Sequence, residues 1–149
     1  MGVMRMASGW TNRGKYNLLK TLQGTALPTN FFIGLTTTTV DEDDNTMADA
    51  TEPAGYARYS LTKNSVDFDT VTETDGSTDR ALIQIKNVAW TASGASLPTA
   101  AATYAVLIDD TSGSGAEIWA YFDLGASRQV SDGQTLTLVD LELRLDEPS

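Results

Sequence analysis

The pattern of apolar and polar residues along the chain is typical of an all-β protein. Apolar and β-branched residues alternate with polar ones in short segments that are separated by Gly, Pro, Asn and Asp. The segments that we expect to be strands are residues 30–37, 55–62, 66–71, 81–90, 104–108, 118–124 and 134–145. With the last segment divided in two, about eight strands at this spacing predict an antiparallel, jelly-roll-like β-sandwich.

The last segment carries the clearest strand signal and an internal change of phase. Leucines of one parity are followed by leucines of the other: Leu136 and Leu138, then Leu141, Leu143 and Leu145. Because side chains alternate between the two faces of a strand, this slip predicts a bulge or corner near Val139 and Asp140. We expect the two earlier leucines to face one environment and the three later ones to face the other side of the chain.

The N-terminal part of the chain predicts an arm followed by one short helix. Residues 1–11 have no periodicity and should form an extended arm that orders only against another surface. Residues 12–24 should form an amphipathic helix, with Thr11 or Asn12 as the N-cap and Gly24 after its last turn. Its apolar stripe consists of Tyr16, Leu18, Leu19 and Leu22, with Arg13, Lys15 and Lys20 outside it. At 149 residues, the chain is expected to be a single domain with the sandwich over residues 30–145.

Three segments are expected to be loops. Residues 38–53 are polar and include an acidic run. Residues 91–103 are mostly small and contain Gly94 and Pro98, which favour a loop over a helix. Residues 109–115 read as a flexible hairpin connection, and no helix N-terminus follows that would make it a phosphate-binding loop.

The distribution of charge changes this picture more than the net charge of −10 does. Residues 1–40 contain no Asp or Glu and carry four basic residues, whereas residues 41–149 carry 6 basic and 20 acidic residues. A basic arm and helix are thus attached to an acidic body. Because nucleic-acid contacts require a surplus of Lys and Arg, nucleic acid is not an expected partner, although the basic part suits an acidic protein surface.

The composition makes most catalytic classes improbable. The chain has no Cys and no His, which removes disulfides, thiolate metal sites and the commonest general base. We therefore expect no enzyme and no cofactor. Apolar runs are too short to span a membrane, and the N-terminus lacks the apolar core of a signal peptide. The expectation is a protein made in the cytoplasm.

The acidic loop is the sharpest candidate metal site. Oxygen-bearing residues follow the offsets of an EF-hand calcium loop: Asp41, Asp43, Asn45, Asp49 and Glu52. Thr46 stands where the calcium loop requires Gly, and no flanking helices are predicted. A solvated acidic loop without a metal is the favoured interpretation.

Two further constellations admit both a functional and a structural interpretation. Asp109 and Asp123 lie at strand ends and could form the carboxylate pair of a glycosidase, but no spacing singles them out. Several aromatic residues could form a sugar-binding platform: Trp90, Trp119, Tyr121 and Phe122. Packing of these rings in the core is the favoured alternative.

The N-terminal basic residues and Trp10 are the candidate partner interface. A lone Trp before a basic helix suits an anchor on a partner, and docking of the arm onto its own sandwich is an equal alternative. The candidate interface residues are Arg5, Trp10, Arg13, Lys15 and Lys20.

The order of these landmarks resembles a family of small structural proteins of tailed bacteriophages, often described as tail-fibre proteins, which includes jelly-roll capsid decoration (cement) proteins. The matching segments, in order, are KYNLLKTLQGTAL from Lys15, FFIGLTTT from Phe31, GYARYSL from Gly55, NVAW from Asn87, AVLIDD from Ala105, IWAYFDL from Ile118 and VSDGQTLTLVDLEL from Val130. The resemblance covers nearly all of the chain after residue 15. It implies a virion structural role with self-association and without catalysis or a cofactor.

From the resemblance and the charge pattern together, we expect a decoration protein on the exterior of a phage capsid. Its partner would be the major capsid protein, which it would bind across neighbouring subunits as a dimer or trimer. A tail, neck or tail-fibre component, including one that binds carbohydrate, is the alternative.

Overall fold

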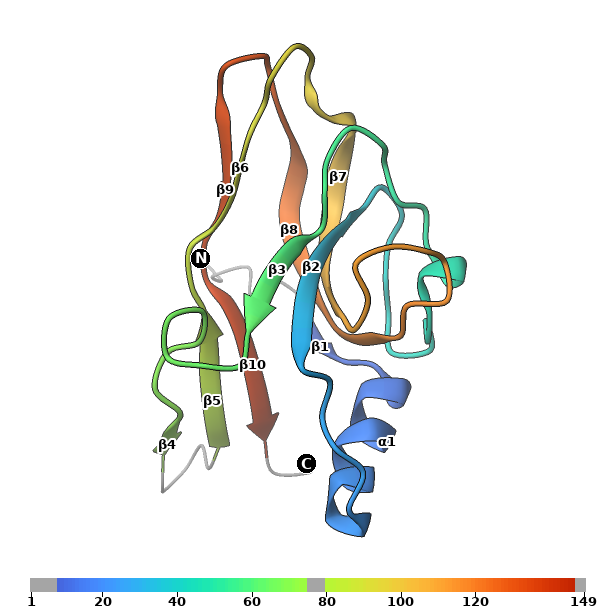
Figure 1. The fold of residues 1–149 in the computed structure, drawn as a ribbon, viewed down its shortest axis with the longest axis vertical. Coiled ribbons are helices and arrows are strands. Elements are labelled where there is room, and N and C mark those ends of the chain that lie inside the picture. The colour runs from blue at the N-terminus through green and yellow to red at the C-terminus, as the bar shows by residue number, and fades with distance from the viewer. Residues whose placement is uncertain (1–7, 75–79, 147–149) are drawn as a thin grey trace, which may run out of the picture.

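The computed structural model describes residues 8–74 and 80–146, which form antiparallel β-sheets and one short α-helix (Figure 1). The strands are β1 (Ser8–Trp10), β2 (Asn30–Thr36), β3 (Tyr59–Thr62), β4 (Thr72–Thr74), β5 (Arg80–Ile85), β6 (Val88–Thr91), β7 (Leu97–Ile108), β8 (Ile118–Val130), β9 (Thr135–Leu138) and β10 (Leu141–Asp146). The helices are α1 (Asn12–Lys20) and the single 3-10 turns η1 (Thr21–Gln23) and η2 (Met47–Asp49). The predicted all-β class is confirmed.

The strands form a β-sandwich-like body from one broad sheet and a folded ribbon. The broad sheet has five strands in the order β1-β8-β7-β2-β3, and smaller sheets have the orders β10-β5-β4 and β6-β9. Buried residues from both layers make one large core, including Ile33 and Leu35 of β2, Leu107 of β7, and Val88 and Leu141 of the smaller sheets. Burial of these apolar side chains supplies the main stabilising free energy.

The second face of the broad sheet is also covered, by the loop that contains the acidic run. Phe32, Val106 and Ile108 point to this face and pack against Val40 and Met47 of the loop. Both loop side chains are almost completely buried. The loop is therefore polar outside and apolar inside, which explains why β2 is buried along nearly its whole length.

Both strands of the ribbon break at the same level, which produces the predicted corner. Asn87 lies between β5 and β6 with a φ of 57°, and Asp140 lies between β9 and β10 with a φ of 59°. Ile85 pairs with Leu141 before the break, and Val88 pairs with Leu138 after it, so the register is unchanged across the break. Asn and Asp tolerate this left-handed conformation better than other non-Gly residues.

The phase change of the leucines has a different consequence from the one predicted. Leu136, Leu138, Leu141 and Leu143 all belong to the same buried core. The left-handed residues turn the ribbon over at the break. Even-numbered leucines before the break and odd-numbered leucines after it therefore point into the same core. The expectation of two environments is wrong. Leu145 lies beyond the core and is exposed.

The expected loop over residues 91–103 is wrong in its second half, because β7 begins at Leu97. Its first residues pair with the last part of β8, with Leu97 opposite Val130 and Ala102 opposite Arg128. The small residues here carry a weak strand signal, and pairing with a distant strand overrides it. The register is irregular between Leu97 and Ala102, as is common where Pro lies in a strand.

Two other predicted strands are correct in place but not in extent, and a third is displaced. The segment from residue 55 is a strand only over Tyr59–Thr62, and the segment from residue 81 is divided at Asn87. Residues 66–71 form no strand; the nearby β4 spans Thr72–Thr74 and pairs with β5. The turn predicted after it, at Asp75 and Gly76, lies outside the described residues.

The helix prediction is confirmed, and the arm prediction is wrong for its last residues. α1 and η1 together span residues 12–23, with Thr11 as the N-cap and Gly24 left-handed at a φ of 89°. Ser8–Trp10 is not a free arm but strand β1, which pairs antiparallel with β8. Pairing with β8 orders these residues and satisfies part of their backbone groups without a partner protein.

The left-handed break predicts the effect of substitutions at Asn87. Replacing it with Val should lower the free energy of unfolding by about 1–2 kcal/mol, because a β-branched residue is strained at positive φ. Replacing it with Gly should leave stability nearly unchanged or raise it. Urea unfolding of the two variants measures the difference, and equal stability of both would show that the break does not require a left-handed residue.

Candidate docking surface

Helix α1 is attached to the sheet through a glycine. A Cβ atom placed on Gly14 would lie 2.7 Å from the carbonyl carbon of Trp119 in β8, so no side chain fits at this position. Gly14 and Leu18 share the inward face of the helix, and Leu18 packs against the main core. The backbone of the helix therefore lies directly on the strand.

The first turn of α1 is bound to β8 by buried hydrogen bonds. The backbone N–H of Thr11 donates to the Trp119 carbonyl at 3.0 Å, and its hydroxyl donates to the Ile118 carbonyl. The same hydroxyl oxygen accepts from the Gly14 N–H at 2.9 Å, which caps the helix. Thr11 is fully buried. The position of α1 is thus determined by its N-terminal turn.

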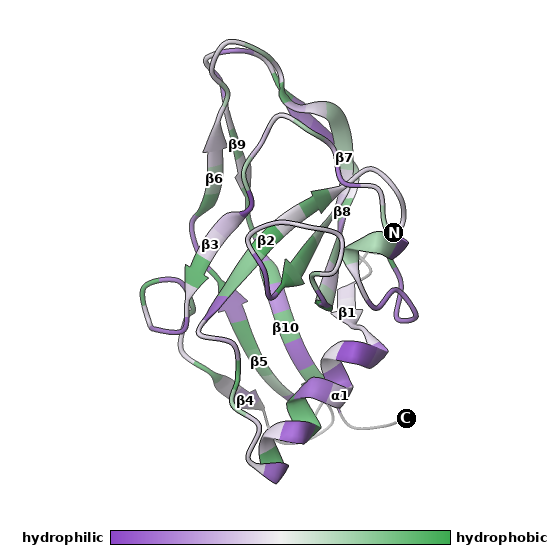
Figure 2. Cartoon of the chain, turned by 45° about the vertical axis from the view of Figure 1, so that its right-hand side comes forward, coloured by the Kyte–Doolittle hydropathy of each residue, from purple (hydrophilic) through white to green (hydrophobic). Residues whose placement is uncertain are grey.

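This mode of attachment leaves the larger apolar side chains of the helix facing solvent. Tyr16, Leu19 and Leu22 are 53%, 65% and 85% exposed. Figure 2 shows hydrophobic and hydrophilic residues alternating along α1 at one end of the molecule. The predicted apolar stripe exists, but apart from Leu18 it points away from the protein.

Basic residues surround this exposed stripe. The guanidinium carbon of Arg13 lies 5.7 Å from the ring centroid of Tyr16, and Nζ of Lys20 lies 5.3 Å from it. Both distances are those of cation–π contacts, which orient long side chains. We define the helix surface as Arg13, Lys15, Tyr16, Leu19, Lys20 and Leu22.

Two of these basic side chains also contact the acidic body. Arg13 lies 3.5 Å from Glu117, and Lys15 lies 3.6 Å from Glu42. Both pairs are well exposed, so each contributes little to stability and leaves the cation accessible. Three of the five candidate interface residues, Arg13, Lys15 and Lys20, are therefore brought together on the helix surface.

The structure separates Trp10 from this cluster. Trp10 is half-buried, packs against the main core, and donates from its indole N–H to the Arg144 carbonyl at 2.7 Å. Of the two interpretations that the sequence left open for Trp10, docking onto its own sandwich is the one observed. Arg5 lies outside the described residues.

The acidic loop does not assemble the geometry of a calcium site. Asp49 accepts hydrogen bonds from the backbone N–H groups of Asn45 and Thr46 at 2.9 and 3.0 Å. Asp41 accepts from the Asp43 N–H at 2.9 Å, and Glu52 is paired with Arg58. Among residues 8–74 and 80–146, no three acidic side chains are grouped in a way that could hold a metal ion. These carboxylates act as local backbone caps.

Glu52 forms part of a buried ionic clamp with Arg58. The Arg58 side chain is only 4% exposed and makes two hydrogen bonds to the Glu52 carboxylate, at 2.9 and 2.7 Å. Its remaining donors reach the carbonyls of Asp110 and Gly113 at 3.1 and 2.9 Å. The hairpin connection that was expected to be flexible is therefore held to the loop after η2.

Tyr56 extends the clamp to strand β2 of the broad sheet. Its hydroxyl donates to Glu52 at 2.5 Å and accepts from the Leu35 N–H at 2.7 Å. Burial by itself raises the pKa of Glu52, but the hydrogen bonds from Arg58 and Tyr56 outweigh it and lower that pKa below 4.5. Burial, followed by the hydrogen bond to Glu52, strongly raises the pKa of Tyr56. At neutral pH the Glu52 carboxylate is therefore ionised, and the Tyr56 hydroxyl keeps its proton.

The remaining candidate constellations are structural. Asp109 accepts from the Glu117 N–H, and Asp123 accepts from the Gly125 N–H, both at 2.8 Å, so each carboxylate stabilises its own turn. Trp119 and Phe122 are buried in the main core. Trp90 packs edge-to-face on Tyr56 and Tyr59 at 5.7 and 5.9 Å. The aromatic residues do not form a shared platform.

Comparisons of the chain with known protein families, with characterised proteins and with solved structures found no match. No helix in the described part of the chain is long and apolar enough to cross a bilayer.

The sequence signal for the helix attachment is Gly14 itself. A glycine within a helical pattern costs about 1 kcal/mol relative to alanine and therefore often has a packing reason. No sequence pattern indicates the clamp, because only the fold brings Arg58 to the carbonyls of Asp110 and Gly113.

Replacing Gly14 with Ala should displace or loosen α1, because the added methyl group meets the Trp119 backbone rather than a movable side chain. We expect a loss of about 1–3 kcal/mol in the free energy of unfolding, measured by urea denaturation. Gly115→Ala is the matched control, since a Cβ there meets open space. A Gly14→Ala variant as stable as the control would contradict the close contact.

Replacing Glu52 with Gln should destabilise the protein by about 2 kcal/mol at pH 7, because Arg58 would keep its burial but lose its charged partner. The folded pKa of Glu52 is below the unfolded value of 4.5. Its contribution is therefore complete above that value and is lost as the pH falls through the lower folded value.

Thermal melts of the wild type and Glu52→Gln between pH 3 and 7 test this directly. The two curves should converge at the acidic end. Glu42→Gln, which removes an exposed pair with Lys15, should cost less than about 1 kcal/mol at any pH. A difference between wild type and Glu52→Gln that does not change with pH would rule out ionisation of Glu52 as its source.

Proposed function

We propose that this protein is a non-enzymatic structural component of a tailed-bacteriophage virion, and that it decorates the exterior of the capsid. The observation that supports the proposal most is the helix surface, on which exposed apolar residues are ringed by basic ones on an otherwise acidic body. The resemblance of the sequence landmarks to phage decoration proteins supplies the class of partner. The jelly-roll description of the sandwich is part of the same proposal and rests on the strand spacing in the sequence and on this resemblance.

The helix surface has the features of a protein docking site. Tyr16, Leu19 and Leu22 expose apolar area to water, which does not stabilise the isolated protein but can be buried by a partner. Aromatic residues such as Tyr16 are enriched in interfaces. The attachment of α1 through Gly14 and Thr11 presents these side chains on a rigid support, which lowers the entropic cost of binding. In this proposal the partner is the major capsid protein.

Charge is expected to control how fast the protein finds the capsid. Arg13, Lys15 and Lys20 favour approach to an acidic surface, and their effect should weaken as salt increases. The acidic residues of the body would then face solvent and discourage binding in the reverse orientation. The apolar residues of the helix surface would determine how long the complex lasts.

The proposed mechanism is stabilisation by linkage. A protein that binds the assembled shell but not its dissociated subunits shifts the equilibrium toward the shell by mass action. Binding as a dimer or trimer across neighbouring subunits would add avidity, because each further contact becomes intramolecular. Many such copies would together raise the temperature at which the capsid opens.

Binding to decoration-free capsids by cosedimentation tests the proposal. The double variant Leu19→Ser, Leu22→Ser should weaken binding by about tenfold or more, because two apolar side chains no longer become buried. The matched control is Val66→Ser, Val71→Ser, which changes two valines that are 67% and 62% exposed on another part of the body.

Equal binding by the two double variants would contradict docking through the helix surface. The position of the protein on virions, seen by cryo-electron microscopy, tests the virion role separately. Copies throughout the capsid lattice are expected. A few copies at the portal vertex would favour the tail or neck alternative, and glycan binding that depends on exposed aromatic residues would favour a carbohydrate-binding fibre.

A further inference from the structure

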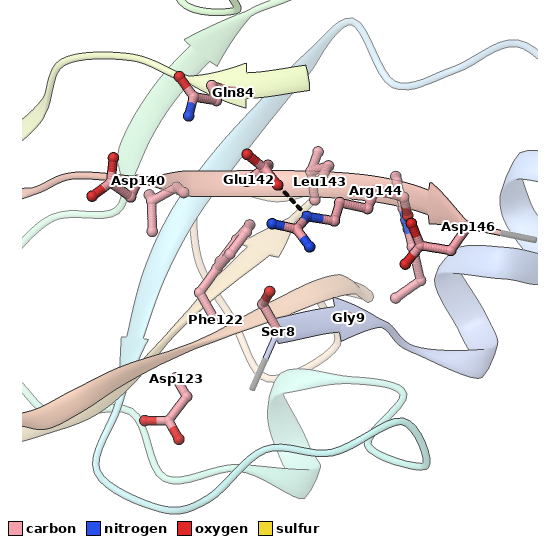
Figure 3. Close-up of a pocket in the computed structure, with 12 residues that line it drawn as sticks. Ser8, Gly9, Gln84, Phe122, Asp123, Asp140, Glu142, Leu143, Arg144 and Asp146 are labelled. Carbon is pink, nitrogen blue, oxygen red and sulfur yellow. Dashed lines mark hydrogen bonds and ion pairs between the residues drawn. The ribbon is translucent and has the colours of Figure 1, made fainter. Parts of the chain in front are cut away.

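A groove of about 560 Å³ lies between β1 and β10, where the two layers of the sandwich remain open on one side. Figure 3 shows β10 running along one wall and β1 along the other, with Phe122 of β8 between them. The Trp10 indole donates to the Arg144 carbonyl at 2.7 Å and bridges the groove near one end. The groove is separate from the helix surface, which lies on the next element of the chain.

Both walls of the groove are sheet edges. β1 ends the five-stranded sheet, and β10 ends the three-stranded sheet. Thr11 bonds to Trp119 of β8, so by the alternation of an antiparallel ladder the backbone groups of Ser8 and Trp10 point away from β8. They point toward the groove.

The same alternation directs part of the β10 backbone into the groove. The Gln84 carbonyl of β5 accepts from the Asp69 N–H on its far side, so Glu142, opposite Gln84, does not bond to β5 through its backbone. The Arg144 carbonyl points the same way, because it accepts from Trp10. The groove is therefore lined by backbone donors and acceptors suited to an added strand.

The side chains of the groove define the chemistry of the segment that fits it. Four carboxylates line it: Asp123, Asp140, Glu142 and Asp146. The guanidinium of Arg144 is the basic group among the lining residues, and it is already paired with Glu142. Phe122, Leu141 and Leu143 add buried apolar side chains beneath. The groove is thus acidic at its rim and apolar at its floor.

We propose that this groove binds an extended segment of a partner protein in which basic and apolar residues alternate. The segment would pair with the outward backbone groups of Ser8 and Glu142, and its apolar side chains would lie toward Phe122. Its Lys or Arg residues would meet Asp140, Asp146 and their neighbours. This inference does not depend on the proposed virion role.

The probe is the peptide acetyl-Lys-Val-Lys-Val-Lys-amide, titrated into the full chain and followed by amide NMR. Shifts should concentrate at Ser8, Trp10, Glu142 and Arg144, including the Trp10 indole N–H. Two comparison peptides separate the contributions. The charge-reversed Glu-Val-Glu-Val-Glu peptide and a version of the first with N-methylated valines should each bind about tenfold more weakly, because one lacks the charge and the other lacks backbone donors.

The protein variant Asp140→Asn, Glu142→Gln should also weaken binding of the lysine peptide by about tenfold, since two carboxylates are neutralised and Arg144 loses its partner. Asn is compatible with the left-handed backbone at position 140. Glu73→Gln on β4, outside the groove, is the matched control and should bind as the wild type does.

Several results would overturn the proposal. One is that the chemical shift changes occur at residues outside the groove. Another is that the N-methylated peptide binds as tightly as the unmodified lysine peptide. A third is that Glu73→Gln weakens binding as much as the double variant does. Spermidine that binds as tightly as the lysine peptide, without slowed hydrogen exchange at Ser8 and Glu142, would identify a site for small cations instead of a strand. Absence of binding at millimolar peptide would also overturn it.

Discussion

The structure depends on a double break in one two-stranded ribbon. Asn87, between β5 and β6, and Asp140, between β9 and β10, both adopt the left-handed conformation at the same level of the ribbon, so the ribbon inverts without changing its register. Without this inversion, one half of the ribbon would turn its apolar residues toward solvent. With it, β5 and β10 below the break and β6 and β9 above it cover a single core on the broad sheet.

The attachment of the N-terminal segment determines the surface chemistry of the molecule. β1, Thr11 and Gly14 contact strand β8 in close succession, and each contact involves backbone or small side-chain groups rather than large side chains. The helix therefore has no need to bury its larger apolar residues. The same short segment forms one wall of the acidic groove and supports the basic helix surface, so two chemically opposite surfaces lie on consecutive elements.

The acidic loop has a structural role that its amino-acid composition does not indicate. Its carboxylates cap neighbouring backbone N–H groups, Val40 and Met47 cover the second face of the broad sheet, and Glu52 holds Arg58 against the hairpin connection. In the part of the chain that the structure describes, these carboxylates are not gathered into a group that could hold a metal ion. The density of negative charge is tolerated because most of these groups have local partners or are exposed.

The sequence by itself determined the all-β class, the helix with its Thr11 cap and Gly24 terminus, and the corner near Asp140. These features depend on local periodicity and on residues suited to caps and turns, which are readable within a few positions. It did not determine the start of β7, the direction of the helix stripe or the partner of Arg58. Those were decided by the tertiary structure, because strand pairing, the contact of Gly14 with β8 and the hydrogen bonds from Arg58 to the Asp110 and Gly113 carbonyls join residues far apart in the chain.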